Sequence, residues 1–428
     1  MATLTHQESA TAEQLVVTDG ARKIFFAIII AGVVLLVVGL MAAIFHWGTG
    51  PEATGTATHG TGSPIWLKRL IISLWHSNLF FVGVSAVGTV FLAINYVAYA
   101  GWSVVIKRIS EAFSVWLVPG GVIMLVVFLL GRHDIFHWTQ EGVMTKGAAN
   151  YDPIIAAKGG FLSGPFYIFR MVSYLTIWAA FSWKLRKLSL EEDLHGGTRY
   201  FHTSVTMSAG FLVLYAVTSS MSGWDWVMSV DVHWFSTLFG WYVFSSWWVS
   251  GIAGITLTAI FLKQNGYLRM LNANHLHDLG KLIFGFSIFW TYLWFSQFML
   301  IWYANLPEEA VYFNQRLGGF NGQYTGLFFL NIVINFVFPF LALMTRDAKR
   351  QMIILKIVCI AILVGHWIDF YLMLMPGTMR GENGFLIEIG VAAIFLGAFL
   401  LLMTRRLAGA LLIPVNHPFV EESVHHTT

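Results

Sequence analysis

Residues 223–240 read GWDWVMSVDVHWFSTLFG and join two strongly apolar runs at 201–222 and 235–262. The connector carries two aspartates, one histidine and three tryptophans, and it contains neither lysine nor arginine. It is therefore too apolar and aromatic to lie freely in water. One interpretation is an aromatic belt at a membrane interface, with aspartates that cap helices. The other is a segment folded back against a helical bundle, where its carboxylates line a site at the membrane surface.

The composition indicates an integral membrane protein. Of the 428 residues, 57% are hydrophobic and only 11% are charged, whereas soluble domains carry about 25% charged residues. The single cysteine, Cys359, lies in an apolar run and is most simply a small core residue. One cysteine excludes a disulfide framework, a CxxCH haem attachment and an iron–sulfur cluster held by this chain alone. Any such centre must lie on a partner.

Ten segments are long and apolar enough to cross a membrane, which takes ~20 residues. They cover residues 24–46, 70–100, 104–131, 162–184, 201–222, 235–262, 282–304, 324–344, 352–375 and 385–404. The sequence therefore predicts an all-α integral membrane protein with one ten-span domain at 24–404. Residues 1–23 and 405–428 are the N-terminal and C-terminal tails.

The distribution of lysine and arginine predicts the orientation. The tails and the connections on their side hold sixteen of these residues, against seven in the connections on the opposite side. Positive charge favours the cytoplasm, so we expect both tails to be cytoplasmic and the 223–240 connector to lie on the outer face.

Ionisable side chains inside membrane spans are costly and usually mark a pathway or a site. With this orientation, most of them lie toward the outer face. The candidates for proton transfer or for contact with a quinone are His76, Asp134, Arg170, Asp225, Asp231, His233, His366, Asp369 and Glu388. We expect them to form a one-sided polar cluster. Few titratable residues lie toward the cytoplasmic half, so a complete transmembrane proton channel is not predicted.

Several candidates have structural explanations as well. Glu388 is suited to complement a helix N-terminus, and Arg170 is best explained as an ion-pair partner for a buried carboxylate. His76 alone is typical of a hydrogen-bonded core histidine. His366 and Asp369 are different, because two titratable groups spaced i,i+3 on one apolar helix face are hard to explain by packing. They are suited to a proton relay or to a quinone ring.

Other polar residues in the spans favour packing over chemistry. Asn331 and Asn335, spaced i,i+4, are more typical of residues that join helices, and Gly390 and Gly397 belong to a small-residue face on the last span. The only histidines away from the ends of the spans, His76 and His366, lack the paired spacing of an intramembrane haem site, and no metal-binding pattern is evident.

The connector, the ten spans and the segment HDLGKLIFGFSIFWTYLWFSQFMLIWYANLPEE at 277–309 resemble the polysulfide-reductase/NrfD-like family of membrane subunits. Within that family they resemble the ActF-type subunits, the second quinone-binding-type subunits of bacterial alternative complex III. The resemblance implies two four-helix bundles, spans two to five and six to nine, flanked by spans one and ten. It also implies a bacterial inner-membrane complex that oxidises menaquinol and reduces a cytochrome c or an oxidase.

The same resemblance implies the partners. They are a homologous quinol-site subunit (ActC-like), an iron–sulfur protein (ActB-like), c-type cytochromes (ActA/ActE-like), small membrane subunits and a terminal oxidase, with lipids around them and no nucleic acid. Haem c and iron–sulfur clusters would lie on the partners, and this chain would bind no redox cofactor. Whether this chain itself binds menaquinone is left open.

Two other functions compete with an oxidoreductase subunit: a ten-span secondary transporter and a purely structural anchor. Transporters usually show repeats with Gly- or Pro-broken helices at mid-membrane. Here Pro119 and Pro339 do not occupy matching positions in two halves.

The purified polypeptide should bind neither haem nor metal, because its spans offer no paired ligands. Absorption spectroscopy and metal analysis of the chain in detergent test this. A Soret band that persists in the pure chain, and is lost on changing His76 or His366, would contradict it.

Overall fold

The computed structural model describes residues 13–45, 63–380 and 385–427. This part of the chain is helical, apart from one isolated β-bridge between Gln14 and Leu411. The helices that run along the molecule are α2 (Asp19–Ile44), α3 (Ile65–Val97), α5 (Leu117–Ile135), α7 (Gly164–His195), α8 (Arg199–Trp226), α9 (Phe239–Gln264), α10 (Ala273–Ala304), α12 (Thr325–Ile332) with α13 (Phe338–Ala342), α14 (Met352–Met379) and α15 (Leu386–Ala408).

Short elements complete the fold. The 3₁₀ turns Gly101–Ile106 and Ser114–Trp116 flank α4 (Lys107–Phe113) ahead of α5, and the π-helical turn Val333–Val337 joins α12 to α13. The remaining short helices are α6 (Pro153–Ala157), α11 (Pro307–Leu317) and α16 (Val420–Val424).

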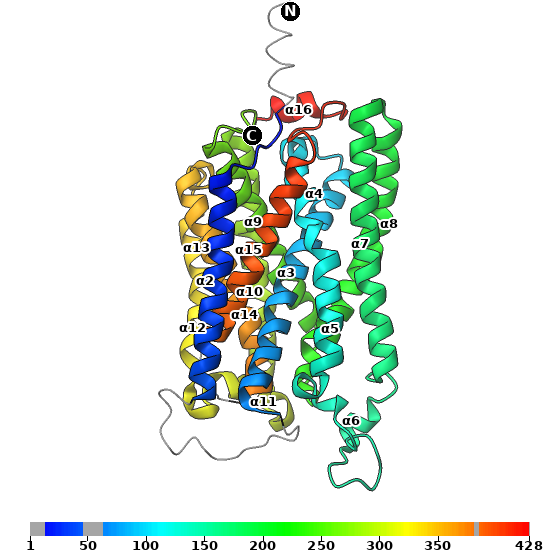
Figure 1. Ribbon diagram of the computed structural model, residues 1–428, viewed down its shortest axis with the longest axis vertical. Coiled ribbons are helices and arrows are strands. Elements are labelled where there is room, and N and C mark those ends of the chain that lie inside the picture. Colours follow the sequence, from blue (N-terminus) through cyan, green and yellow to red (C-terminus); the bar gives the residue numbers. More distant parts are fainter. Residues whose placement is uncertain (1–12, 46–62, 381–384, 428) are drawn as a thin grey trace, which may run out of the picture.

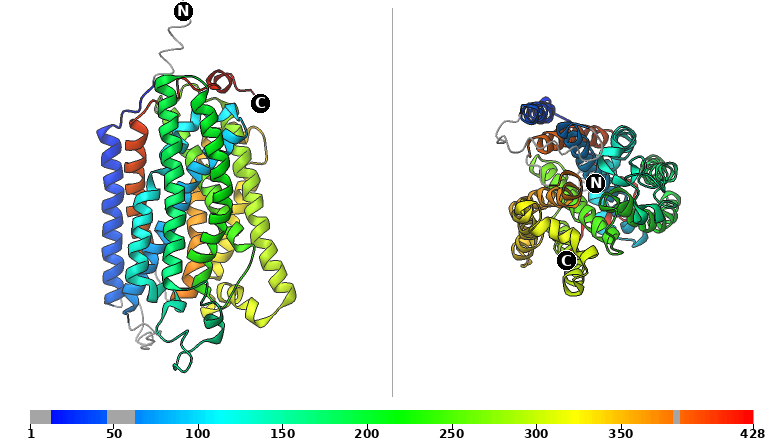
Figure 2. Two further views of the ribbon diagram at one scale, coloured as in Figure 1. Left: turned by 90° about the vertical axis from the view of Figure 1, so that its right-hand side faces the viewer. Right: turned by 90° about the horizontal axis from the view of Figure 1, so that it is seen from below.

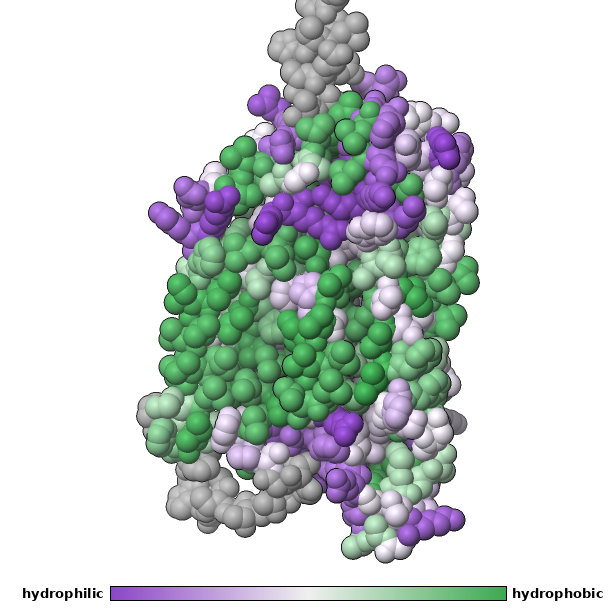
Figure 3. Space-filling model, turned by 45° about the vertical axis from the view of Figure 1, so that its right-hand side comes forward, coloured by the Kyte–Doolittle hydropathy of each residue, from purple (hydrophilic) through white to green (hydrophobic). Residues whose placement is uncertain are grey.

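Nine helices of the described chain are long and apolar enough to cross a membrane, which confirms a multi-pass helical membrane protein. A band of apolar side chains lies between two polar ends (Figure 3). The tenth long helix, α7, is 32 residues long but is not among the nine. Its apolar part contains Arg170, and it ends in a charged stretch after Ser182, so its mean hydropathy is lower.

The first and last described residues lie at the same end of the molecule, beside α16 (Figure 1). We call this the termini end. The opposite end, which carries α6 and α11, is the distal end. The connector after α8 lies at the distal end, on the opposite side from the tails, as the alternation of spans predicted.

Helix contacts divide most of the long helices into two groups. In the first group, α3 contacts α5 and α8, and α7 contacts both α5 and α8. In the second, α9 contacts α10 and α14, α12 and α13 contact α14, and α13 contacts α10. The groups meet where α3 packs against α9 and α14 and where α8 packs against α9. Helices α2 and α15 form a pair at the edge of the molecule (Figure 2).

Small residues allow this edge pair to approach closely, as predicted for the last span. A Cβ atom added at Gly390 would lie 2.8 Å from the Gly32 carbonyl oxygen, and one added at Gly397 would lie 2.9 Å from the Phe25 carbonyl oxygen. Close backbone approach at glycine is a common way to join helices in lipid.

The 223–240 segment is folded back against the bundle. Its first four residues continue α8, so Asp225 is helical and the connector itself is shorter than predicted. The side chains of Val230, Val232 and Trp234 are buried. The Lys158 ammonium group, which follows α6, donates to the Val232 carbonyl at 2.6 Å, so the long loop between α5 and α7 covers the connector.

A network of buried charges at the termini end corrects one prediction. The sequence placed few titratable groups in this half, because it counted Lys107, Arg108 and Arg186 as charges of connections. Lys107 and Arg108 are instead buried on α4. The ion pairs are Lys107–Glu192 (3.0 Å), Arg108–Glu111 (2.8 Å), Arg186–Glu111 (3.2 Å) and Arg108–Asp193.

The C-terminal tail closes the same end. Ser423 donates its hydroxyl to the Trp102 carbonyl at 2.9 Å, and the His426 ring lies 2.5 Å from the Asp278 carboxylate on α10. Burial lowers the pKa of His417 to about 2, with Lys107 and Arg108 adding to the effect, so this imidazole is neutral at pH 7.

Two engineered cysteines test the topology. Cys359 is buried, and we expect Cys359→Ala to give a silent background. In it, Lys146→Cys at the distal end and Glu421→Cys at the termini end should react with a membrane-impermeant maleimide from opposite sides, with Lys146→Cys labelled in intact cells. Both positions are exposed. Labelling of both from one side would contradict the fold, and labelling of Glu421→Cys alone in intact cells would reverse the orientation.

Candidate functional site

The Asp369 carboxylate, fully buried on α14, is held by donors from three other helices. Ser246 on α9 donates to Oδ2 at 2.7 Å, Trp290 on α10 donates to Oδ2 at 3.0 Å, and Asn331 on α12 donates to Oδ1 at 2.8 Å. The Tyr242 hydroxyl on α9 also donates to Oδ1. Within the described residues no lysine or arginine pairs with Asp369, so four neutral donors stabilise this carboxylate.

His366 lies one turn from Asp369, toward the termini end. Its Nδ1 atom is 3.8 Å from the Asp369 Oδ2 atom, which is too long for a direct hydrogen bond. The ring is fully buried, packs edge-on against Trp290 at a centroid distance of 5.3 Å, and has no hydrogen-bond partner in the described chain. The two residues share a site, as their spacing predicted, and a proton passing between them needs a small movement or a bridging water.

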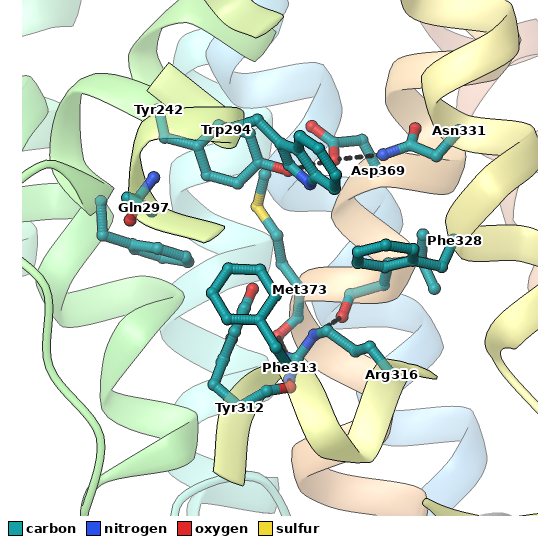
Figure 4. Close-up of a pocket in the computed structure, with 12 residues that line it drawn as sticks. Tyr242, Trp294, Gln297, Tyr312, Phe313, Arg316, Phe328, Asn331, Asp369 and Met373 are labelled. Atoms are coloured by element: carbon teal, nitrogen blue, oxygen red, sulfur yellow. Dashed lines mark hydrogen bonds between the residues drawn. The ribbon is translucent and has the colours of Figure 1, made fainter. Parts of the chain in front are cut away.

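A small pocket lies on the distal side of Asp369 (Figure 4). Its volume of about 20 Å³ gives room for roughly one water. Asp369 and Asn331 lie on one side of it, and Tyr312 and Arg316 of α11 lie on the other. Its full lining is Phe239, Tyr242, Trp294, Gln297, Tyr312, Phe313, Arg316, Phe328, Asn331, Asp369, Leu372 and Met373.

Arg316 separates this pocket from the distal end. Its guanidinium group donates to the Leu372 carbonyl at 2.8 Å, to the Tyr312 carbonyl at 2.6 Å and to Asp231 Oδ2 at 3.2 Å. Its carbon lies 3.3 Å from the centre of the Tyr312 ring. Burial raises the pKa of Tyr312 above its usual value, so the phenol keeps its proton. The positive charge of Arg316 is therefore balanced by the Asp231 carboxylate and not by the Tyr312 phenol.

Asp231 lines a cavity of about 370 Å³ at the distal end, together with Tyr312 and His233. A neighbouring cavity of about 300 Å³ is lined by Asp134 and His137, among others, and the two share His137 in their walls. Asp231 thus contacts both the arginine beside the buried pocket and the open distal cavity.

Asp225 and Arg170 form a second site, within the first group of helices. The guanidinium group donates twice to the carboxylate, from Nε and Nη2, each at 2.8 Å. The Tyr174 hydroxyl adds a bond at 3.3 Å, and the Arg170 carbon lies 3.8 Å from the centre of the Phe161 ring. The predicted role of Arg170, as the partner of a buried carboxylate, is confirmed.

The remaining distal candidates are nearer the surface. His233 is half exposed, and its Nε2 lies 2.6 Å from Asp152 Oδ2. Partial burial acts to raise the pKa of Asp152, but hydrogen bonds from His233 and two backbone amides outweigh it and lower that pKa. Burial lowers the pKa of His137 below its usual value. Asp134 has one buried carboxylate oxygen without a hydrogen-bond partner among the described residues.

His76 and Glu388 belong to neither site. His76 Nε2 lies 2.9 Å from the Trp367 carbonyl oxygen, which fits a hydrogen-bonded core histidine. Glu388 is in the first turn of α15, as expected, but its partner is Arg69 of α3, whose Nε is 2.7 Å from Oε1. This buried pair ties the last helix to the first group.

Of the predicted site residues, only Asp369 lines the buried pocket. His366 lies beside Asp369, and Asp231 pairs with Arg316 on the far side of the pocket. The other candidates lie in separate contacts. The site also contains residues that the sequence did not single out. Arg316 had been counted as a charge of a connection. Ser246 carries no signal of its own in an apolar run. Only comparison across helices would have identified them.

No known family model matches this sequence, and no curated protein is significantly similar to it.

The Arg170–Asp225 pair should be structural. Arg170→Gln leaves a buried carboxylate without its counter-charge and should destabilise the protein by roughly 3–5 kcal/mol. The double variant with Asp225→Asn should recover most of this. Thermal unfolding in detergent measures both. Lys187→Gln is the control, because that lysine is half exposed and its pair with Glu191, at 3.8 Å, is long and weak. Arg170→Gln with an unchanged Tm would contradict the structural role.

Proposed function

We propose that this chain is a ten-span membrane subunit of a quinol:cytochrome c or quinol:oxidase oxidoreductase of the alternative complex III type. In this proposal the chain belongs to the NrfD-like family, resembles the ActF-type subunits, and carries no redox cofactor itself. It contributes the architecture next to a homologous quinol-site subunit and a path for protons toward the outer face of the bacterial inner membrane.

The ten-span arrangement is supported by the ion pair that compensates the charge of Arg170 on α7. Arg170 is the residue that makes α7 less apolar than the nine other helices, and its guanidinium group is paired with Asp225 inside the first group. An ion pair of this kind lowers the penalty for placing arginine at membrane depth. The contacts within α3, α5, α7 and α8, and within α9, α10, α12–α13 and α14, fit two four-helix bundles flanked by α2 and α15.

The functional proposal rests on a series of polar groups that leads in space from Asp369 to the distal end. A buried carboxylate, a pocket with room for one water, the Arg316–Asp231 pair and an open cavity follow one another. Oxidation of a quinol releases protons as well as electrons, and acids and histidines that lead to one face are suited to carry them.

The size of the pocket supports one division of roles within the proposed complex. About 20 Å³ beside Asp369 holds a water and not a quinone ring. We therefore assign quinol oxidation to the homologous partner subunit, and electron transfer to the iron–sulfur and c-type haem subunits. This chain's own residues would bind and pass protons.

A secondary transporter is the alternative from another class, and interrupted helices are the observation that favours it. The 3₁₀ turns precede α5 and the π-helical turn interrupts α12–α13. These interruptions fall in the second helix of the first group and in the third helix of the second group, so they do not match. Co-purification with haem and iron supports the oxidoreductase subunit, whereas substrate transport by the chain alone would support the transporter.

Asp369→Asn should keep assembly and haem content but slow quinol-driven turnover or weaken its coupling to the proton gradient, because a carboxamide does not accept the proton. His366→Ala should act in the same direction. The double variant should be no worse than the more severe single variant, since one relay is broken either way. Turnover per complex and proton release in liposomes are the measurements.

Asp347→Asn is the matched control, because Asp347 is an exposed carboxylate in a connection at the termini end and should leave both measurements unchanged. If Asp369→Asn complexes assemble and show normal turnover, coupling and pH dependence, the proton path is wrong. If both site variants lower only the yield of intact complex, the chain is an anchor.

A further inference from the structure

Asp225 and Asp369 occupy corresponding places in the two groups of helices, and their surroundings differ. Each lies on the fourth helix of its group, and each receives a hydrogen bond from the third helix. For Asp225 that donor is Arg170 of α7, and for Asp369 it is Asn331 of α12. One carboxylate therefore has a fixed cation, and the other has only neutral partners.

The contacts of Asp225 favour its anionic form. A guanidinium group has donors and no acceptor, and two of its N–H groups face the two carboxylate oxygens at 2.8 Å. A proton added to Asp225 would displace one of these two bonds or would have to turn to the Tyr174 hydroxyl, which lies 3.3 Å from Oδ2. The Tyr167 hydroxyl, which is also nearby, donates to the Asp225 backbone carbonyl at 3.1 Å.

Asp369 can be satisfied in both protonation states, because a hydroxyl group both donates and accepts. The Ser246 hydroxyl lies 2.7 Å from Asp369 Oδ2 and 3.1 Å from the Tyr242 carbonyl oxygen. When Asp369 is ionised, Ser246 donates to it. When Asp369 is protonated, its O–H donates to Ser246 Oγ, and the serine proton turns to the Tyr242 carbonyl.

Neither state needs a heavy atom to move. Trp290 Nε1 lies 2.9 Å from Ser246 Oγ and 3.0 Å from Asp369 Oδ2, so this donor serves both positions of the serine proton. Rotation of one hydroxyl is enough to exchange the two arrangements.

The charged and titratable groups that face Asp369 do not impose one state. Its own helix supplies His366, at 3.8 Å, and α9 supplies the Tyr242 hydroxyl. From α11, Tyr312 and Arg316 line the same pocket. The Arg316 guanidinium group is already occupied by Asp231 and by backbone carbonyls, and α10 and α12 supply neutral donors only.

We propose that Ser246 is a positioning residue whose hydroxyl switches between donor and acceptor, so that Asp369 exchanges a proton while Asp225 stays ionised. The place of this exchange in a quinol-oxidising complex rests on the proposed function. The exchange itself is a property of this chain.

Infrared difference spectroscopy of the full-length chain in lipid nanodiscs, between acidic and alkaline buffer, tests the inference. A protonated carboxylic acid has a C=O band that the carboxylate lacks. We expect a buried carboxyl band that disappears in Asp369→Asn and persists in Asp225→Asn. In Ser246→Ala the band should move to higher frequency, because the Asp369 O–H has lost its acceptor.

Two further variants make the frequency shift specific. Ser246→Cys supplies a weaker acceptor of similar size and should give a smaller shift. Ser250→Ala should leave the band in place, because the Ser250 hydroxyl donates to the Ser246 backbone carbonyl at 2.7 Å and does not contact Asp369. If Ser246→Ala does not fold, Ser246→Cys alone still distinguishes a shifted band from an unshifted one.

The inference is overturned if no band depends on Asp369, if the band depends on Asp225, or if it keeps its frequency in the folded Ser246 variants. Its failure differs from failure of the proposed function. An Asp369-dependent band in the isolated chain, combined with normal turnover of Asp369→Asn complexes, would uphold the exchange site and reject the proton path.

Discussion

Charge buried in an apolar bundle must be compensated, and this constraint explains most of the polar contacts in the molecule. An isolated ion in a medium of low polarity is strongly disfavoured unless it has a counter-charge or a full set of hydrogen bonds. The chain uses both solutions. Asp225 has a two-pronged bond to a guanidinium group, and Asp369 has four neutral donors. The same requirement joins helices that are distant in sequence.

These contacts organise the bundle as well as the site. In lipid the hydrophobic effect does not draw helices together, so hydrogen bonds and close packing specify their arrangement. Asp369 connects α14 to α9, α10 and α12, and thereby ties together the helices of the second group. Arg170 and Asp225 connect α7 to α8, and Glu388 and Arg69 connect α15 to α3. The candidate site and the scaffold therefore use the same side chains.

This explains which features were predictable from the sequence. Nine of the spans were, because apolar length sets them. The pairing of Arg170 with a buried carboxylate was also predictable, because a lone arginine in a span needs one. The site around Asp369 was found through ionisable residues. Arg316 was missed because a charge near a helix end looks the same in a sequence whether it faces water or the bundle. Ser246 was missed because its importance arises from two acceptors on different residues.

The two groups of helices also differ in their capacity to move a proton. Transfer needs groups that change hydrogen-bond partners, and in the first group Asp225 is held by the Arg170 guanidinium group. On α4, Glu111 is likewise held by Arg108. The second group offers hydroxyls and amides around Asp369, and on the distal side the pocket, the Arg316–Asp231 pair and the open cavity follow them. Along α14, from its first residue to His366, the buried positions are apolar: Leu355, Val358, Cys359, Ile362 and Gly365. The polar contacts that start at Asp369 therefore continue to the distal end, which supports the proposed release of protons on that side.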